Sequence, residues 1–305
     1  MDEIYKDILE KIADIREFPD GAYNIRVDGK SIGRENTRTV EIKAKEASRG
    51  IDVFISSDAF DETIHIPVVI GITGHSEVVY NDFYIDKGAR VTIVAGCGIH
   101  NCGSGRSQHD GIHSFHVGAG AHVIYSEKHI GSGDGTGERI LNPVTNIHLS
   151  ENSYLEMETT QIEGVDSTER ETIAEIGDGA TLIVREKLMT HGKQYAKTVF
   201  VVNLNGYKSG ADIVSRSVAK DDSEQIFLSV INGNNVSTGH SECDAIIMDN
   251  AVVKAVPEIT ANNVDASLIH EAAIGRIAGE QIVKLMTLGL DEQQAEQKII
   301  EGFLN

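Results

Sequence analysis

Apolar and polar residues along the chain follow two different periods. Over residues 3–17 the apolar residues recur at helical spacing, which predicts a short amphipathic helix with one buried face. These residues are Ile4, Ile8, Leu9, Ile12 and Ile15. After residue 21 the period becomes two, as in Val40, Ile42 and Ala44, and this alternation predicts strands separated by polar turns.

From about residue 80 the alternating segments form a weak internal repeat. Four of them share an apolar start, a turn with a small residue and an alternating apolar end: IDKGARVTI at Ile85, VGAGAHVIY at Val117, LSENSYLEM at Leu149 and IGDGATLIV at Ile176. Their turn residues, together with that of a looser copy, recur at a nearly constant step and are Gly88, Gly120, Asn152, Gly179 and Gly210. The third of these four steps is the shortest. Self-similarity of this kind is typical of stacked supersecondary units.

This repeat predicts the fold class. Strand-only units with glycine or asparagine at each corner indicate a mainly β chain whose core is a right-handed parallel β-helix. The 30 glycines, the 5% aromatic content and the absence of tryptophan suit a core of small branched side chains. A β-sandwich built from regular hairpins would show the same alternation, but it would not require the recurring step.

Helical spacing returns near the C-terminus. One helix is predicted over residues 278–288, Gly289 ends it, and a second follows over residues 292–303 with Asp291 as its cap. The chain is therefore predicted to have an N-terminal helix and connector at 1–35, a β-helix core at 36–272 and a helical region at 273–305. The helical region would cap one end of the β-helix, which repeat proteins need for solubility.

Charge and cysteine content narrow the function. The 47 acidic and 27 basic residues give a net charge of −20, which argues against nucleic-acid binding. No stretch is apolar for long enough to form a membrane span, so none is expected. Three cysteines do not make a disulfide framework in so long a chain, which favours a reducing cytoplasm.

Cysteine and histidine are concentrated between the first two repeats. The segment from Cys97 also carries His100, Cys102 and His113, and the first three of these form a candidate metal or cluster site in a glycine-rich stretch. Its spacing lacks the paired knuckles of a structural zinc site. On a helix, His109, His113 and His116 would share one face. The sequence here favours a strand, so His113 should point to one side and His116 to the other.

A second candidate site lies near the end of the predicted β-helix. Cys243 precedes an apolar strand, and His270 and Glu271 follow it at a separation close to one repeat step. Thiol, imidazole and carboxylate groups hold iron or zinc. A single cysteine is more often a small buried apolar residue, however, and that alternative stays open here.

Familiar catalytic motifs are missing from the sequence. It contains no GxxxxGK[ST] phosphate loop, no GxSxG nucleophile elbow and no HExxH metal motif. The glycine-rich stretch from Gly131 to Gly137 has no lysine, and we interpret it as a flexible loop.

The motifs around these candidate residues resemble the SufB/SufD family, the scaffolds of SUF-type iron–sulfur cluster assembly. The resemblance rests on ECDAIIMD, a later proline and IHEAAIGRIAGEQ, and on the closing run that ends in EGFL. GARVTIVAGC and the later GIH resemble a second family region, in which Cys97 and His113 match a cysteine and a histidine. The resemblance extends from about residue 80 to 304, and Ala95, His100 and Cys102 depart from the family pattern, which indicates a short, divergent member.

The resemblance implies a non-enzymatic scaffold that holds a transient iron–sulfur cluster. Cys243, His270 and Glu271 would bind the cluster from adjacent coils, with iron or zinc at the Cys97 segment as a further expectation. The helical region would dock a SufC-like ABC ATPase, and the chain would pair with itself or with a SufB/SufD paralogue. The rival interpretations are a β-helix carbohydrate-active enzyme, which would need a groove of basic and aromatic groups, and a purely structural β-helix module.

Overall fold

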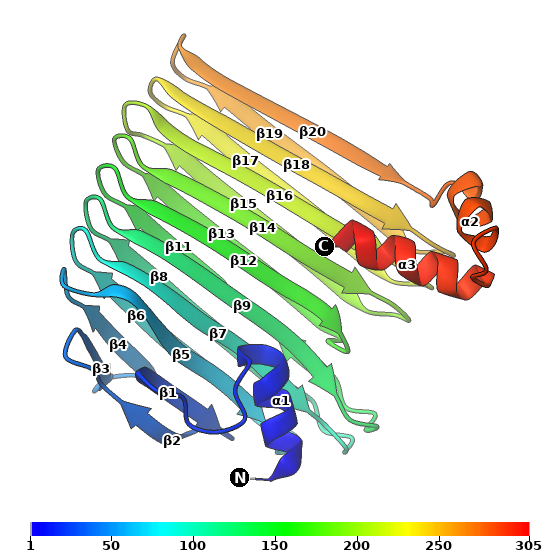
Figure 1. Cartoon of the computed structure of the whole chain (residues 1–305), viewed down its shortest axis with the longest axis horizontal. Helices are drawn as coiled ribbons and strands as arrows, with labels where there is room; N and C mark the ends of the chain where they lie inside the picture. The colour runs from blue at the N-terminus through cyan, green and yellow to red at the C-terminus, as the bar shows by residue number, and fades with distance from the viewer. Residues whose placement is uncertain (1, 305) are drawn as a thin grey trace.

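Two long sheets face each other along a stack of coils (Figure 1). This computed structural model describes residues 2–304. The first strands are β1 (Ala22–Val27), β2 (Lys30–Glu35) and β3 (Val40–Ala44). The coils then consist of β4 (Gly50–Ile55) with β5 (Phe60–Ile70), β6 (Ser76–Ile85) with β7 (Arg90–His100), β8 (Ser107–Val117) with β9 (His122–Ser132), β10 (Arg139–Leu141) and β11 (Val144–Leu149) with β12 (Tyr154–Glu163), β13 (Ser167–Ile176) with β14 (Thr181–Thr190), β15 (Tyr195–Leu204) with β16 (Ser209–Ala219), β17 (Glu224–Gly233) with β18 (Ser237–Ile247), and β19 (Val252–Ala261) with β20 (Ala266–Gly275).

Each coil contributes strands to both sheets, and neighbouring coils pair in parallel. One sheet has the order β2-β1-β5-β7-β9-β12-β14-β16-β18-β20, and the other runs from β19 to β3. From β4 onward the pairs are parallel, and the strands form about eight stacked turns. The predicted parallel β-helix is therefore confirmed, and the sandwich of hairpins is excluded.

The register between coils explains the uneven repeat. Arg90 lies opposite His122, and His122 opposite Tyr154, so the first two predicted steps are the true ones. Tyr154 then lies opposite Thr181, which confirms the shorter third step. The fourth step is shorter than predicted, because Thr181 lies opposite Gly210, which is inside β16 rather than at the turn. The turn residue of that coil is Lys208, with a φ of 58°.

The core fills the space between the two sheets. Side chains at alternate positions of each strand point inward, so that along β8 every second residue is buried. Small branched residues dominate this core, and aromatic rings are concentrated where Phe83, Phe115 and Tyr125 pack together. The alternation confirms that His113 faces inward and His116 outward.

The N-terminal end differs from the predicted connector. β1 pairs antiparallel with β2 but parallel with β5, so the β fold begins at Ala22 rather than near residue 36. β3 and β4 form a second antiparallel pair. The predicted helix is present as α1 (Glu3–Ala13), shorter than 3–17, and its buried face packs on the outer side of β5, β7 and β9.

Two helices follow the last coil. The sequence predicted both, and they are α2 (Gly279–Met286) and α3 (Glu292–Leu304). α3 lies back along the sheet, where Ile300 and Leu304 pack on Val218 and Ile246 (Figure 1). Among residues 2–304 no helix has both the length and the apolar character needed to cross a membrane.

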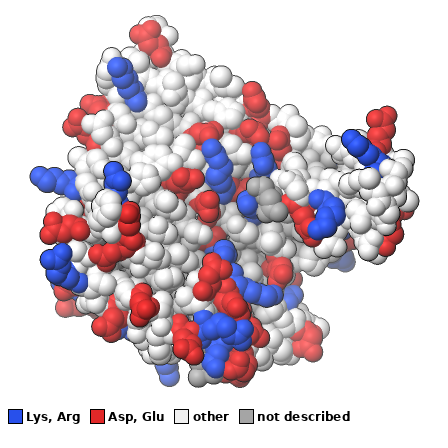
Figure 2. Space-filling model, in the orientation of Figure 1, with Lys and Arg blue, Asp and Glu red and all other residues white. Residues whose placement is uncertain are grey.

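Acidic and basic side chains are mixed over the molecular surface. On the face drawn in Figure 2, lysines and arginines lie among aspartates and glutamates instead of forming one basic patch. That distribution, with the net charge of −20, gives this face little attraction for a polyanion.

Candidate functional site

Cys243 lies inside the second-to-last turn of the β-helix, which is formed by β17 and β18. It is on β18, where alternation points it inward, and it is 1% exposed. Its neighbours across the sheet are Ser215 on β16 and Ala272 on β20. Burial, and then the negative charges of Glu186 and Asp244, raise the pKa of the Cys243 thiol to about 12. The thiol is therefore protonated at neutral pH unless a cation displaces the proton.

His270 lies on the same inner side, on the terminal strand. It is opposite Ser241, two positions from the Ala272 that faces Cys243, so its side chain shares the inner face with the thiol. Neither ring nitrogen has a hydrogen-bond partner within residues 2–304, although both are shielded from solvent. Burial is the main cause that lowers the His270 pKa, which favours the neutral ring. A neutral, unpartnered imidazole is a ready metal ligand.

Glu271 does not join this pair. It is opposite Glu242, and both side chains point outward, because successive residues of a strand face opposite sides of the sheet. The expectation that Cys243, His270 and Glu271 would surround one centre is therefore wrong for Glu271. The expectation that Cys243 and His270 lie on adjacent coils is confirmed by the pairing of β18 with β20.

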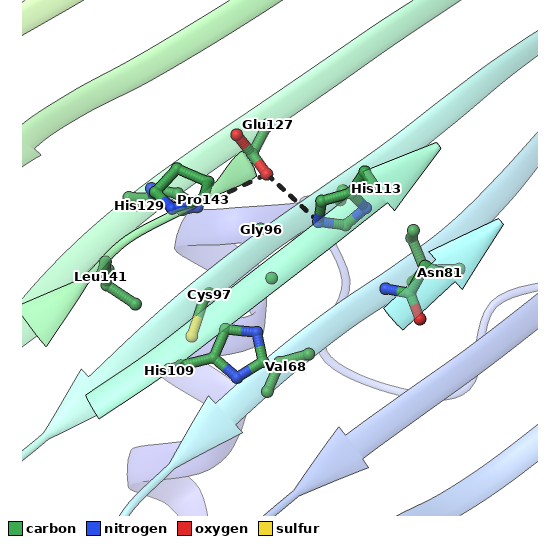
Figure 3. A pocket seen from close by; sticks show the side chains of 13 residues that line it. Val68, Asn81, Gly96, Cys97, His109, His113, Glu127, His129, Leu141 and Pro143 are labelled. Atoms are coloured by element: carbon green, nitrogen blue, oxygen red, sulfur yellow. Dashed lines mark ion pairs between the residues drawn. The ribbon is translucent and has the colours of Figure 1, made fainter. Parts of the chain in front are cut away.

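A second polar group lies inside the coil near Cys97. Cys97 is 2% exposed and faces inward from β7, and it lines a cavity of about 20 Å³ together with His109, His113, Glu127 and His129 (Figure 3). That volume holds about one water molecule. Burial, followed by the charges of Glu77 and Glu127, raises the pKa of the Cys97 thiol well above its usual value.

Glu127 is the centre of this inner group. One of its oxygens is 2.6 Å from Arg170, and the other accepts a hydrogen bond from the Tyr125 hydroxyl at 2.9 Å. His129 and His113 approach the carboxylate at 3.5 and 3.8 Å (Figure 3). Burial opposes ionisation of Glu127, but the N–H of His129 and the charge of Arg170 outweigh it and hold the Glu127 pKa well below its usual range.

The surroundings assign the protonation of His129. Its Nδ1 lies 3.3 Å from an Arg170 nitrogen, which can only donate, so Nδ1 accepts and the proton is on Nε2, which faces Glu127. His113 stays neutral as well, since burial lowers its pKa to about 4.

Buried polar contacts continue from this group to Cys243. Arg170 approaches Glu186 at 3.9 Å, and Glu186 accepts hydrogen bonds from Thr198 at 2.9 Å and from Ser215 at 2.6 Å. Ser215 lies directly opposite Cys243. Buried polar side chains therefore follow one another inside the coils from the cavity beside Cys97 to the strand partner of Cys243.

The predicted site of Cys97, His100 and Cys102 is not formed. His100 points outward from β7 while Cys97 points inward, because the two are an odd number of positions apart on one strand. Cys102 is exposed, and its Sγ lies 3.0 Å from His100 Nε2, whose Nδ1 lies 3.0 Å from Ser132 Oγ. His100 and Cys102 are together on the surface, and His113 accompanies Cys97 inside.

Sequence reasoning missed most of the inner polar group. His109, Glu127, His129, Arg170 and Glu186 are all buried, and none was identified as a candidate. A signal was present: each falls in the inward register of its strand, as Glu127 does two positions after Tyr125. A charged residue in an apolar register marks a buried polar site that must find its partners inside.

Comparisons with known proteins show the family to which the chain is similar. Residues 73–303 match the family described as SUF system FeS cluster assembly, SufBD core domain. An iron-sulfur cluster assembly SufBD family protein of Pyrococcus horikoshii is 28% identical over 284 residues, which cover 90% of this chain and 84% of that protein. One from Methanocaldococcus jannaschii is 26% identical over 249 residues, 80% of this chain and 77% of that protein. A second Pyrococcus horikoshii protein of this description is 39% identical over 92 residues, 30% of this chain and 21% of that protein.

Proposed function

The chain belongs to the SufBD family of iron–sulfur cluster assembly proteins, and we propose that it is a non-enzymatic scaffold that holds a nascent cluster between its last two coils. The observation that carries this proposal is that Cys243 and His270 share the inner face of β18 and β20, and that neither ring nitrogen of His270 has a hydrogen-bond partner within residues 2–304. Soft thiolate sulfur holds iron, and imidazole completes a set that can release its product. The cluster is the scaffold's cargo and not a resident cofactor.

The pKa of Cys243 supports transient loading. Because this pKa is about 12, iron must displace a proton from the thiol, and cluster binding therefore weakens as the pH falls. A ligand that prefers to be a neutral thiol releases its metal more readily than a preformed thiolate would. The exposed end of the coil gives the cluster a way out, since β20 has no neighbour on its far side among residues 2–304.

Anaerobic reconstitution tests the assignment. The purified chain is incubated with ferrous iron and sulfide, desalted, and analysed for bound iron, sulfide and visible absorption. We expect Cys243→Ala to abolish the bound cluster and His270→Ala to lower its amount several-fold. Cys102→Ser is the matched control, because it removes an exposed thiol that is not on β18 or β20. A Cys243→Ala protein with wild-type iron and sulfide would refute the proposed site.

We propose that the open end of the β-helix pairs with a second chain. β19 and β20 are the outermost strands of the two sheets, and both are largely exposed, with Val252, Ile259 and Ile269 between 44% and 55% exposed. An uncovered strand edge tends to pair with another edge. A two-fold pair is the commonest closed solution, with a second copy or a SufB/SufD paralogue as partner.

The mass of the protein in solution tests this pairing. We expect a dimer at micromolar concentration, and a monomer for Ile259→Lys, which puts a charge into the edge. Val78→Lys is the control, because Val78 is 39% exposed but lies on β6, which has a neighbour on each side. A monomeric chain that also fails to bind a co-expressed paralogue would refute the pairing.

We also propose that α2 and α3 dock a SufC-like ABC ATPase. The supporting observation is that α2 has no buried residue. Val283, Met286 and Leu288 are 59%, 44% and 76% exposed, close to the apolar contact of α3 with the sheet. Leu288→Glu should abolish co-purification with the cognate ATPase and leave the β-helix folded, whereas Glu296→Gln on α3 should not. These two substitutions test the docking surface more directly than deletion of residues 276–305, because the deletion would also expose Val218 and Ile246 to solvent.

The rival enzymatic function finds little support on the outer surface. Aromatic side chains form a ladder there of Phe54, Tyr84, His116 and His148, with ring centroids 5.0 to 5.5 Å apart. In this ladder the ring faces cover one another, so mainly edges are left for a sugar to contact. A carbohydrate-binding groove needs free aromatic faces.

A further inference from the structure

The outer face of the last two coils carries a group of side chains that the proposed cluster site does not use. His240 and Glu242 point outward from β18, and Glu271 points outward from β20. One ligand atom from each of the three lies within 4.8 Å of those of the other two. Cys243 and His270 are on the opposite side of the same sheet, so this group is separate from them.

The two carboxylates are in an unfavourable position unless a cation joins them. Glu242 and Glu271 are directly opposite each other on adjacent strands, which lie about 4.8 Å apart. Like charges placed directly opposite in a sheet destabilise it.

A second and independent observation concerns the orientation of His240. Its Nδ1 lies 2.7 Å from an oxygen of Asp212 on β16, and the other oxygen of Asp212 lies 2.6 Å from Arg185 on β14. A carboxylate oxygen at this distance accepts a hydrogen bond from Nδ1–H, so Nε2 is left with its lone pair free. A carboxylate that fixes the tautomer of a histidine in this way is the usual support of a histidine that binds a metal ion.

We propose that His240, Glu242 and Glu271 bind one divalent transition-metal ion on the outer face of β18 and β20, supported by Asp212 through His240. One imidazole and two carboxylates suit Zn²⁺, Fe²⁺ or Mn²⁺ and leave at least one position open to water. Bonds of about 2.1 Å put neighbouring ligand atoms about 3.4 Å apart, so a small closure of the present arrangement completes the site.

The ion would also stabilise the pairing of the terminal strand β20 with β18. β20 pairs on one side only, and its side chains are mostly exposed, so it has few other contacts to hold it against β18. An ion shared by Glu242 and Glu271 crosses this single pairing and protects it from fraying. The proposal goes beyond the scaffold function, because it requires neither a cluster nor Cys243.

Zinc titration of the metal-free Cys243→Ala protein tests the site without interference from the inner thiol. Isothermal calorimetry should find one Zn²⁺ per chain. We expect His240→Ala to weaken this binding at least tenfold, Glu242→Gln to weaken it likewise, and Asp212→Asn to weaken it about 10- to 100-fold through the lost support of His240. Glu258→Gln is the matched control, because it removes an exposed carboxylate of the same coil from the other sheet, and its binding should equal that of the parent.

Two further measurements distinguish binding at this outer site from binding at Cys243. Co²⁺ bound by the wild-type chain at this site should show no thiolate charge-transfer band, whereas a band that vanishes with Cys243→Ala reports the inner site. Amide hydrogen exchange of β20 should slow when Zn²⁺ is added, and it should not in His240→Ala. Absence of zinc binding by the Cys243→Ala protein, or binding unchanged by both His240→Ala and Glu242→Gln, would overturn the proposal. If the wild-type chain accepts no cluster but keeps the His240-dependent zinc site, only the scaffold function fails.

Discussion

At the scale of single residues, the three thiols have three different surroundings. Cys97 and Cys243 face the inside of the coils, where burial raises the pKa of each thiol, and Cys102 is exposed beside His100. Only a thiolate attacks an electrophile, so burial suppresses reaction both by blocking access and by removing the thiolate. The exposed thiol is therefore the reactive one in the free chain.

Alkylation rates give the first prediction. With iodoacetamide at mildly alkaline pH, Cys102 should react fully while Cys97 and Cys243 stay unmodified, because burial raises the pKa of both thiols. For Cys243 the pKa of about 12 leaves on the order of a thousandfold less thiolate than usual. Mass spectrometry of the peptides measures all three. His100→Gln should slow the reaction of Cys102, because the imidazole that accepts or shares its proton is lost. Faster labelling of either buried cysteine would contradict the described interior.

The buried pair of Glu127 and Arg170 gives the second prediction. Both side chains are at most 5% exposed and lie 2.6 Å apart. Arg170→Met leaves an unpaired buried carboxylate, so we expect it to lower the free energy of unfolding by about 3–5 kcal/mol. The double variant Glu127→Gln with Arg170→Met should recover most of that loss in urea denaturation. Losses that simply add would show that the two charges do not interact.

At the scale of elements, α1 packs closely on the sheet because two residues of β7 that face it, Gly96 and Gly98, have no side chain. Gly98 faces Ile8 of α1 so closely that a Cβ built on it would lie 2.1 Å from the Ile8 side chain. A Cβ on Gly96 would lie 3.0 Å from the Ile12 side chain. The apolar stripe of α1 predicted burial, but the partner surface is defined by glycines that lie far along the chain from it.

Substitution at Gly98 gives the third prediction. Gly98→Val should displace α1 and cost about 1–3 kcal/mol by overpacking, with faster proteolysis near the N-terminus. Gly210→Val is the matched control on β16, because a Cβ there meets its neighbours at an ordinary 3.5 Å. The control should be neutral or slightly stabilising, since valine favours strands. Equal losses for both variants would mean that the contact with α1 is not responsible.

At the scale of the whole molecule, stability depends on polar groups sealed between the sheets. Burial lowers the pKa of His113 to about 4, so the ring can be protonated near neutral pH only if the fold opens. Burial opposes ionisation of Glu77, but His109 and then Arg26 outweigh it and lower the Glu77 pKa to about 2. Each group therefore adds to the free energy of unfolding near neutral pH, and its contribution is lost as the pH falls.

The pH dependence of stability gives the fourth prediction. The contribution of His113 is complete above its unfolded pKa of 6.5 and is lost between pH 6.5 and 4, at most about 3 kcal/mol. That of Glu77 is lost between pH 4.5 and 2. His113→Phe should therefore flatten the first decline in urea denaturation, and His116→Phe, which replaces an outward ring, should not. An unchanged decline in His113→Phe would contradict the buried neutral ring.

The success of sequence-based prediction differs from one feature to another. Alternation, recurring turns and helical spacing predicted the coils, α1, α2 and α3, because each depends on neighbours in sequence. Family motifs and the repeat step predicted that Cys243 and His270 lie on adjacent coils, which the pairing of β18 with β20 confirms, and their role in cluster binding stays a prediction. The inner polar group around Glu127 was missed, because its members come from several coils and no local pattern connects them.

The amino-acid sequence by itself determined that this chain is a stack of β coils and that its motifs are those of SufBD proteins. Only the tertiary structure decided which candidate ligands meet, and the reason is the register of β18 against β20, in which Cys243 lies opposite Ala272. His270 is two positions from that partner and shares its face, whereas Glu271 is one position away and points to the other side. The step from His122 to Tyr154 is longer than the step from Tyr154 to Thr181. Repeat spacing alone therefore does not assign a side chain to the inner or the outer face of the β-helix.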